Sequence, residues 1–289
     1  MATGKAARRK EERKGFMKAS IPMTTVLIVG LAGSAQGLFI DFDGLNTGVG
    51  LAGQTSSAVD GDGVSLADPT WQDGGGDGTV VDGDLGTAMS ETSSSPYYLH
   101  GGSFTKGIYL NVSGLDAAGG FWMSTLFQVS AVVPGSSGHF GTVALYEGGS
   151  EKLNMGTETF NFADNQYRLT GGAIDSSKTP DNGISSGVAV DADTHLLAMQ
   201  YDPSDTGNEL KIWVDPDFSA LATAPDASGP AFAAELANID SLALRGGGSA
   251  VALLDNIYLG NNSPFIPEPA SLALVGLGGL CLLARRKRA

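Results

Sequence analysis

Apolar and polar residues alternate in short segments along the middle and the C-terminal half of the chain, with Gly, Asp, Ser and Thr between them. In residues 121–129 this alternation places four large side chains on one face of an extended segment: Phe121, Met123, Phe127 and Val129. A period of two is typical of antiparallel strands with one buried face. The pattern therefore predicts a half-buried strand here.

The same alternation predicts further strands toward the C-terminus. Their apolar faces consist of Leu197, Met199 and Tyr201, of Leu210, Ile212 and Val214, of Leu242 and Leu244, and of Val251, Leu253, Ile257 and Leu259. Lys211 and Trp213 fall on the face opposite Leu210. Between residues 36 and 263, the only helix that the sequence predicts is a short one, Ala231–Leu236. Several strands without strongly amphipathic helices favour one all-β domain, an antiparallel sandwich or jelly roll.

The N-terminus has the features of a secretory signal, which we place at residues 1–35. Residues 1–20 carry seven Lys or Arg and two Glu, and residues 21–32 are mainly apolar. Residues 33–35, Gly-Ser-Ala, are the small residues that a signal peptidase needs. The basic part is long for a signal, and a start at Met17 would give ordinary proportions. An N-terminal membrane anchor is the alternative.

The C-terminus, residues 264–289, combines three features in order. The tripeptide Pro267, Glu268 and Pro269 precedes an uncharged apolar run, which ends in four cations: Arg285, Arg286, Lys287 and Arg288. The run, residues 270–284, predicts a transmembrane helix, although 15 residues at a rise of about 1.5 Å are short for a ~30 Å hydrocarbon core. The cations should stay on the cytoplasmic side, so the preceding domain, residues 36–263, should lie outside.

These three features resemble the PEP-CTERM sorting signal of Gram-negative, exopolysaccharide-producing bacteria. The resemblance implies export, transient anchoring in the inner membrane through the C-terminal helix, and cleavage by an exosortase at residues 267–269. Signal peptidase and exosortase are then the expected partners, and the cell envelope or extracellular matrix is the expected location. An ordinary C-terminal membrane anchor is the alternative interpretation.

The predicted domain at residues 36–263 is strongly acidic, with 6 Lys or Arg against 28 Asp or Glu. Such a surface repels phosphate backbones, which argues against nucleic acid as a partner. It suits solubility outside a cell, and it also suits the binding of cations. The only cysteine, Cys281, lies in the C-terminal apolar run, so no intramolecular disulfide can form. About 228 residues are nevertheless enough to bury a large core without a cross-link.

Three segments, in this order along the chain, resemble the concanavalin A-like (laminin G-like) jelly roll that is common in exported PEP-CTERM proteins. They lie within residues 39–54, 121–153 and 196–260. The resemblance implies two curved antiparallel sheets with a concave face and, in some members, carbohydrate or calcium binding. It does not imply one activity, because this fold occurs in lectins, enzymes and adhesion modules.

Asp255 is the main candidate for a structural calcium site. The alternation places it with Leu253 and Ile257, on the face predicted to be buried, where a lone carboxylate is costly. In concanavalin-like domains the last strand often meets the first at a structural calcium, and by this resemblance Asp255 pairs with Asp41 and Asp43. Hydrogen bonding to the backbone, or a local bulge, is the alternative. The Asp/Gly-rich loops at residues 60–63 and 73–84 are interpreted as turns, with calcium binding as the alternative.

No segment has the spacing of catalytic carboxylates. Catalytic jelly rolls of the β-glucanase type carry a Glu-x-Asp-x-(x)-Glu strand, whose carboxylates supply the nucleophile and the acid/base. The nearest pair here, Glu147 and Glu151, is separated by Gly-Gly-Ser, which predicts a hairpin turn. A pair from distant strands is left open. The three histidines of the chain are too widely spaced for a zinc motif.

Sugar binding needs exposed aromatic rings with polar neighbours, and Trp71 and Trp213 are the candidates for it. Packing in the core is the alternative for both. The sequence thus predicts a non-enzymatic surface or matrix protein whose domain serves adhesion or weak glycan binding, with exopolysaccharide as a candidate partner. A secreted glycan-active hydrolase or lyase on the same fold is the alternative function.

Overall fold

The computed structural model describes residues 37–42, 45–56, 58–61, 63–73, 78–81, 97–100, 107–129, 140–158, 165–174, 183–216, 224–247 and 252–263. All of them lie in the second of the two units into which the chain divides, residues 33–289. The predicted signal and sorting segments and Asp43 fall outside the described residues. Within those residues, no helix has the length and apolar character needed to cross a membrane.

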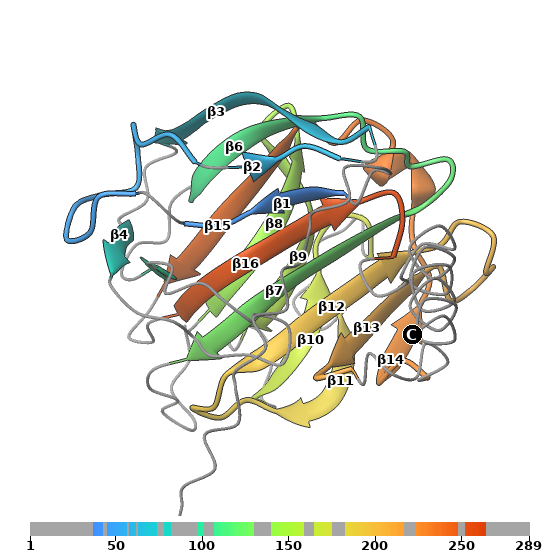
Figure 1. The fold of residues 1–289 in the computed structure, drawn as a ribbon. Coiled ribbons are helices and arrows are strands. Elements are labelled where there is room, and N and C mark those ends of the chain that lie inside the picture. The colour runs from blue at the N-terminus through green and yellow to red at the C-terminus, as the bar shows by residue number, and fades with distance from the viewer. Residues whose placement is uncertain are drawn as a thin grey trace, which may run out of the picture. The chain divides into compact units, whose positions relative to one another are not determined.

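Nine of the described strands form one antiparallel sheet (Figure 1). Seven follow one another in the order β14 (Ala227–Gly229), β13 (Leu210–Val214), β12 (His195–Tyr201), β7 (Phe121–Val129), β16 (Ala252–Gly260), β1 (Leu38–Ile40) and β2 (Ala58–Val59). Strand β16 also pairs with β5 (Tyr97–His100), which pairs with β4 (Gly78–Val81). The first and last described strands, β1 and β16, are therefore neighbours, as the jelly-roll resemblance implies.

A second antiparallel sheet of seven strands forms the other layer of the fold (Figure 1). Its order is β11 (Ile184–Ala189), β10 (Gln166–Thr170), β9 (Ser150–Glu158), β8 (Phe140–Glu147), β15 (Ser241–Gly247), β6 (Ile108–Ser113) and β3 (Ser65–Asp73). Two layers of antiparallel strands confirm the predicted all-β jelly-roll sandwich. The helices predicted for the signal and for the C-terminal membrane span lie outside the described residues.

The core lies between the two sheets and is built by the alternation seen in the sequence. Strand β7 has the predicted bounds, and Phe121, Met123 and Phe127 on its inner face are fully buried. Leu145 and Met155 of the other sheet belong to the same apolar cluster. Burial of apolar surface contributes roughly 25 cal/mol per Å². With no intramolecular disulfide to assist, this burial is the main source of stability.

The predicted short helix and the predicted hairpin turn are both present. A four-residue 3₁₀-helix, η1 (Ala233–Leu236), lies inside the predicted segment and buries Leu236. Gly148 and Gly149 turn the chain between β8 and β9, with φ angles of 55° and 82° that glycine adopts without a Cβ clash. The two glutamates on either side of this turn therefore belong to different strands, as expected.

Strand β16 contains a bulge that the sequence alternation does not reveal. Its register with β7 shifts between Asp255 and Tyr258, and Asn256 has a positive φ of 50°. The Asp255 Oδ1 atom accepts a hydrogen bond of 2.8 Å from the Asn256 backbone N–H. The Thr125 hydroxyl donates to the Asp255 carbonyl oxygen at 3.0 Å. These bonds stabilise the irregular backbone where the regular ladder is interrupted.

The bulge changes which side chains of β16 face the core. Leu254 and Ile257 both belong to the core cluster, although three positions separate them, whereas Leu253 does not belong to it. The prediction that Leu253 and Ile257 share a face with Asp255 is therefore wrong, because one extra residue reverses the alternation. Asp255 is nonetheless fully buried, at 0% exposure. It pairs across the sheet with Leu126, which also lies outside the core cluster.

Candidate functional site

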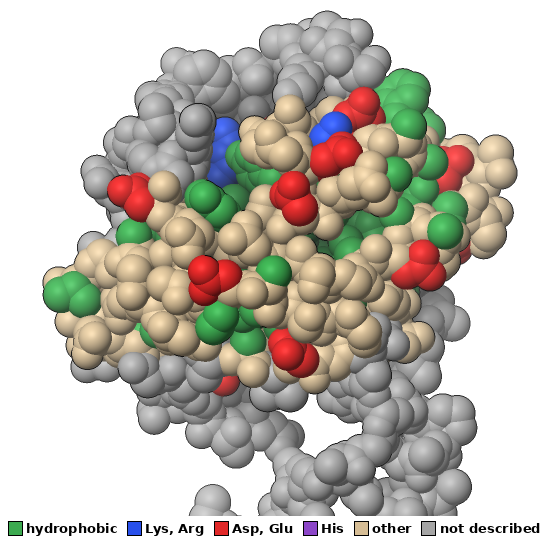
Figure 2. Space-filling model, turned by 90° about the horizontal axis from the view of Figure 1, so that it is seen from above, with side chains coloured by type: hydrophobic (Ala, Val, Ile, Leu, Met, Phe, Trp, Pro, Cys, Tyr) green, Lys and Arg blue, Asp and Glu red, His purple; other side chains and the backbone are tan. Residues whose placement is uncertain are grey.

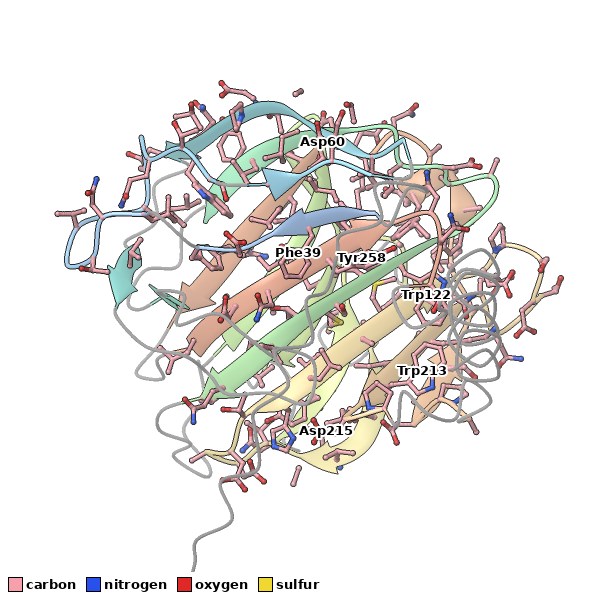
Figure 3. The ribbon with its side chains drawn as sticks, in the orientation of Figure 1. Phe39, Asp60, Trp122, Trp213, Asp215 and Tyr258 are labelled. Atoms are coloured by element: carbon pink, nitrogen blue, oxygen red, sulfur yellow. The ribbon has the colours of Figure 1, made fainter. Side chains whose placement is uncertain are left out.

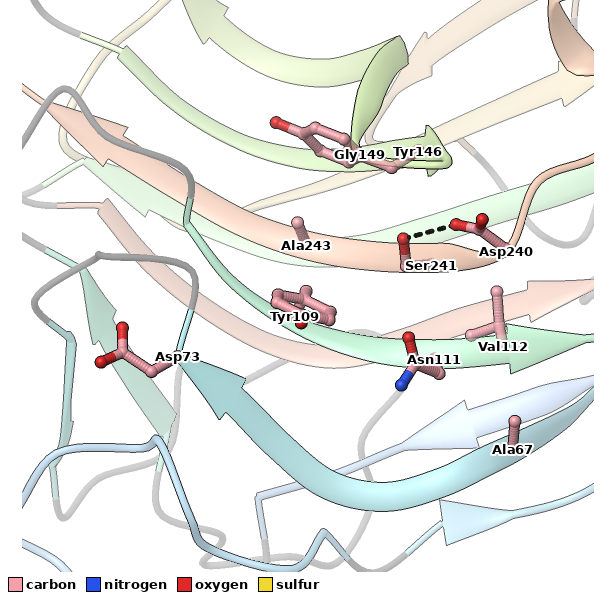
Figure 4. A pocket seen from close by; sticks show the side chains of 10 residues that line it. All are labelled: Ala67, Asp73, Tyr109, Asn111, Val112, Tyr146, Gly149, Asp240, Ser241 and Ala243. Carbon is pink, nitrogen blue, oxygen red and sulfur yellow. Dashed lines mark hydrogen bonds between the residues drawn. The ribbon is translucent and has the colours of Figure 1, made fainter.

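A groove of about 650 Å³ lies on the outer face of the seven-stranded sheet (Figure 4). It extends over strands β3, β6, β15 and β8. Its lining residues are Ala67, Asp73, Tyr109, Asn111, Val112, Tyr146, Gly149, Asp240, Ser241 and Ala243. Most of these are the outward-facing residues of strands whose alternate residues fill the core, such as Leu110 and Leu242. The groove is thus a product of the same alternation that forms the sandwich.

The register of three strands aligns the lining residues in rows. Ser241 of β15 lies between Asn111 of β6 and Tyr146 of β8. One row further along, Ala243 of β15 lies beside Tyr109 of β6. The central strand thus carries small side chains, while larger ones stand on both flanking strands. This difference in size makes the face hollow.

Hydrogen bonds fix one end of the groove. The Asp240 Oδ1 atom accepts a bond from the Ser241 hydroxyl at 2.8 Å (Figure 4), and its Oδ2 atom accepts one from the Gly148 backbone N–H at 2.7 Å. The Asp240 backbone N–H donates to the Tyr146 carbonyl oxygen at 2.9 Å. The start of β15 is therefore tied to the hairpin turn between β8 and β9, which gives the groove a preformed end wall.

The groove also presents polar groups that are not used inside the domain. Neither the hydroxyls of Tyr109 and Tyr146 nor the side-chain amide of Asn111 forms a hydrogen bond with another described residue. All three side chains are partly exposed. Burial raises the pKa of Tyr146, and the nearby Arg245 charge opposes the shift only in part. The Tyr146 hydroxyl is therefore neutral at physiological pH, and it can both donate and accept a hydrogen bond.

The two tryptophans proposed for sugar binding lie elsewhere. Trp71 is 1% exposed and stacks on Phe42, with ring centroids 5.9 Å apart, so it has the packing role left open above. Trp213 lies on the outer face of the nine-stranded sheet, opposite the core residues of its strand, as predicted. It is 8% exposed and stacks on Trp122 at 5.2 Å (Figure 3). Sugar binding at Trp213 stays a prediction.

The calcium prediction is also left as a prediction. The structure pairs β1 with β16, but Asp43, one of the three proposed ligands, lies outside the described residues. The Asp41 carbonyl oxygen accepts a hydrogen bond from the Ser56 hydroxyl at 3.2 Å. In the part of the chain that the structure describes, no three Asp, Glu, His or Cys side chains converge as metal ligands.

His195, at the start of β12, is held between two carboxylates. Its Nδ1 atom lies 2.6 Å from Asp215 Oδ2, and its Nε2 atom lies 2.8 Å from Asp191 Oδ1. Both nitrogens donate only when the ring is protonated. Burial by itself would lower the pKa of His195, but the hydrogen bonds to Asp191 and Asp215 outweigh it and raise the pKa above its ordinary value. The arrangement ties the loop before β12 to the end of β13.

We expect His195→Gln to destabilise the protein more at pH 5.5 than at pH 9. Because folding raises the pKa of His195, its stabilising contribution is complete below the unfolded value of about 6.5, and it is lost as pH rises through the folded pKa. The carboxylates of Asp191 and Asp215 are 55% and 53% exposed. Solvent screening should therefore limit the difference to about 1 kcal/mol. Urea unfolding at the two pH values measures it.

The control for this experiment is Asp205→Asn. Asp205 forms an ion pair of 2.8 Å with Lys211, a partner that stays charged from pH 5.5 to pH 9. The cost of this substitution should be the same at both pH values. Equal costs of His195→Gln at both pH values would show that the imidazole is not held as a cation.

Sequence reasoning did not identify the groove residues. Tyr109 and Asn111 occur as the polar-side residues of an ordinary alternating strand, Ile108–Ser113, and nothing in that segment marks them as functional. The signal that could have pointed to the groove is the run of small outward residues in β15, Ser241 and Ala243. Its meaning depends on the neighbouring strands, which the sequence does not specify. The residues of the sorting signal lie outside the described part of the chain.

Solved structures with a similar fold include two neurotoxin domains and one enzyme. The botulinum neurotoxin serotype C1 binding domain gives a TM-score of 0.45 at 10% identity, and the match covers 79% of this chain and 51% of that domain. The serotype D/C binding domain gives a TM-score of 0.48 at 8% identity, and the match covers 84% of this chain and 52% of that domain. Trypanosoma rangeli sialidase in complex with sialic acid gives 0.42 at 11% identity, covering 79% of this chain and 31% of its own. The chain spans about half the length of the neurotoxin domains, and it spans less than a third of the length of the enzyme. Likenesses at this level carry no functional argument.

The C-terminal segment provides the firm assignment. No curated protein matches the chain. Residues 265–288, however, match the family described as the PEP-CTERM protein-sorting motif. This match contains the tripeptide at 267–269, the apolar run and the four terminal cations. The motif indicates an exported protein of a Gram-negative bacterium that an exosortase processes. The chain therefore carries a PEP-CTERM protein-sorting motif, at residues 265–288, C-terminal to an antiparallel β-sandwich domain.

Proposed function

We propose that the β-sandwich is a non-catalytic glycan-binding domain of an exported surface or matrix protein. The observation that carries the proposal is the groove, in which Tyr109 and Tyr146 stand on either side of the small residues of β15. Tyrosine rings pack on the apolar faces of sugar rings, and their hydroxyls bond to sugar hydroxyls. A hollow lined by aromatic rings and a few polar groups is typical of small-molecule and oligosaccharide sites.

The sorting motif gives this domain a setting in which glycan binding is useful. The four terminal cations keep the C-terminal end of the motif on the cytoplasmic side, so the sandwich lies on the outer side of the inner membrane. Exosortase cleavage at Pro267, Glu268 and Pro269 then transfers the domain to the envelope surface or the matrix. The proposed ligand there is exopolysaccharide, and the proposed task is adhesion to it.

The test is binding of the full-length chain to a panel of polysaccharides, measured by affinity electrophoresis. Tyr109→Ala and Tyr146→Ala should each weaken binding about tenfold, which corresponds to ~1.4 kcal/mol. The melting temperature of each variant should stay close to that of the wild type, because both side chains are partly exposed on the outer face. Unchanged binding in both variants would remove the groove as the binding site.

Trp122→Ala provides the matched control on the opposite sheet. Trp122 stacks on Trp213, one of the two tryptophans that the sequence offers as candidates for sugar contact. If the groove binds the glycan, this variant should bind as the wild type does. Weakened binding in Trp122→Ala, together with normal binding in the tyrosine variants, would move the site to the nine-stranded sheet.

One observation favours a hydrolase as the second candidate. Two carboxylates, Asp73 and Asp240, line the same groove, and glycoside hydrolysis uses a pair of carboxylates. Both oxygens of Asp240, however, already accept hydrogen bonds from Ser241 and Gly148. Release of reducing sugar by the wild type that Asp73→Asn abolishes would support the hydrolase. Binding without such release would support the adhesion role.

A further inference from the structure

The charges around the groove indicate which class of glycan it takes. Among the described residues, the lining includes two carboxylates, Asp73 and Asp240, and no lysine or arginine. Asp240 uses both oxygens in holding the end wall of the groove, and both of its donors, the Ser241 hydroxyl and the Gly148 backbone N–H, are uncharged groups. The charged side chains that the structure describes in the groove are therefore of one sign.

Two described cations on strands of the same sheet, Arg245 and Lys152, are already paired with carboxylates. Arg245 lies two residues after Ala243 on β15, and it forms an ion pair with Glu151 of β9. Lys152, on the same strand as Glu151, lies 3.0 Å from Glu147 and 2.6 Å from Glu235. The hydrogen bond to Glu235, followed by that to Glu147, raises the pKa of Lys152. These two cations are thus balanced by three carboxylates and offer little attraction to an anionic ligand.

The surface beyond these pairs is acidic as well. Figure 2 shows Asp and Glu side chains spread over one face of the described domain, with few Lys or Arg side chains among them. The whole chain has a formal net charge of −14, although basic residues are concentrated at its two ends. A negative field of this kind repels polyanions before contact, and it is screened by salt over about 10 Å at 0.1 M.

The polar groups of the groove suit hydroxyl groups. The Asn111 amide both donates and accepts, and the hydroxyls of Tyr109 and Tyr146 do the same. A carboxylate such as that of Asp73 accepts hydrogen bonds from hydroxyl groups, and these bonds are stronger than hydrogen bonds between two neutral groups. A neutral sugar unit offers donors, acceptors and an apolar ring face. A uronic acid or sulfated unit would instead place a second negative charge beside Asp73 or Asp240.

We infer that the groove binds neutral polysaccharide and discriminates against carboxylated or sulfated polysaccharide. This inference rests on the proposed glycan-binding function and adds the ligand class to it. The discrimination arises from like charge rather than from shape. It should therefore depend on ionic strength, and it should respond to removal of one lining carboxylate.

The test compares neutral glucan, mannan and galactan with the carboxymethylated derivative of each, using the full-length chain. We expect at least one neutral polymer to bind, and its carboxymethylated form to bind about tenfold more weakly at 50 mM salt. The ratio of the affinity for the neutral polymer to the affinity for its carboxymethylated form should fall toward one at 0.5 M salt. Asp73→Asn should reduce the ratio about threefold at low salt. Asp193→Asn, which removes the same charge from the exposed loop before β12, should leave the ratio unchanged.

The outcomes distinguish failure of the inference about ligand class from failure of the proposed glycan-binding function. Equal or tighter binding of the carboxymethylated polymers at 50 mM salt would overturn the inference about ligand class and leave glycan binding in place. If Asp193→Asn changes the ratio as much as Asp73→Asn does, the whole surface and not the groove selects the ligand. This outcome would also overturn the inference. Failure of every polymer to bind, neutral or anionic, would overturn the proposed function itself.

Discussion

Replacement of Trp71 by alanine should lower the free energy of unfolding by about 4 kcal/mol, within the range for deleting a buried aromatic side chain. The ring is 1% exposed and stacks on Phe42, which follows β1. The backbone of Trp71 also pairs with the preceding loop, donating to the Gln54 carbonyl at 2.9 Å and accepting from the Gly53 N–H at 2.8 Å. A cavity here would loosen the contact between β3 and the segment after β1. Denaturant unfolding measures the loss, and thermal unfolding should show a midpoint lowered by roughly 8 to 16 °C.

Phe232→Ala is the control for this experiment. Phe232 is 50% exposed and precedes the short helix η1. Its removal should change the free energy of unfolding by about 0.5 kcal/mol or less, because little burial is lost. A cost for Trp71→Ala as small as that of Phe232→Ala would show that the ring is not part of the core. It would also reopen the sugar-stacking role considered for Trp71.

Replacement of Gly156 by alanine should cost about 3 kcal/mol, through steric strain rather than a cavity. Gly156 lies within β9, between β8 and β10, with a φ of 152°. A Cβ atom there would stand 2.1 Å from the Gly141 carbonyl oxygen and 2.9 Å from the Thr142 Cα atom. Both contacts are backbone atoms of the neighbouring strand, so β8 and β9 would have to separate. Urea unfolding of the variant gives the cost.

Gly187→Ala is a matched control because this glycine also has a positive φ, of 79°, but nothing lies within 4 Å of the position that its Cβ would take. It should cost only the local backbone penalty of about 1 kcal/mol. The difference between the two variants isolates the effect of strand packing. Equal costs would mean that the sheet adjusts freely at Gly156, contrary to the close packing of β8 against β9.

The glycan-binding function proposed for the domain agrees with the way in which the domain is stabilised. The sorting motif indicates export, and the chain has no intramolecular disulfide to stabilise the domain, since its only cysteine lies in the sorting segment. Stability must therefore come from the apolar contact of two large sheets. This leaves the outer faces free to carry polar and aromatic side chains. The groove on the seven-stranded sheet is the place where those side chains converge.

Local patterns in the sequence determined a large part of this fold. Alternation with period two predicted β7 with its bounds, and a glycine pair predicted the turn between β8 and β9. These features can be read from the chain because they depend on neighbouring residues only. The sorting motif is of the same kind, since an order of proline, apolar and basic residues requires no folding to be recognised.

The tertiary structure alone decided where the site lies. Tyr109, Tyr146 and Ser241 are far apart in the sequence, and they line one groove only because β15 pairs with β6 on one side and with β8 on the other. The face on which Asp255 lies was likewise decided by a bulge, which needs Asn256 at positive φ and Thr125 across the sheet. Pairing of distant strands depends on the total burial of two sheets, and no short segment contains that information.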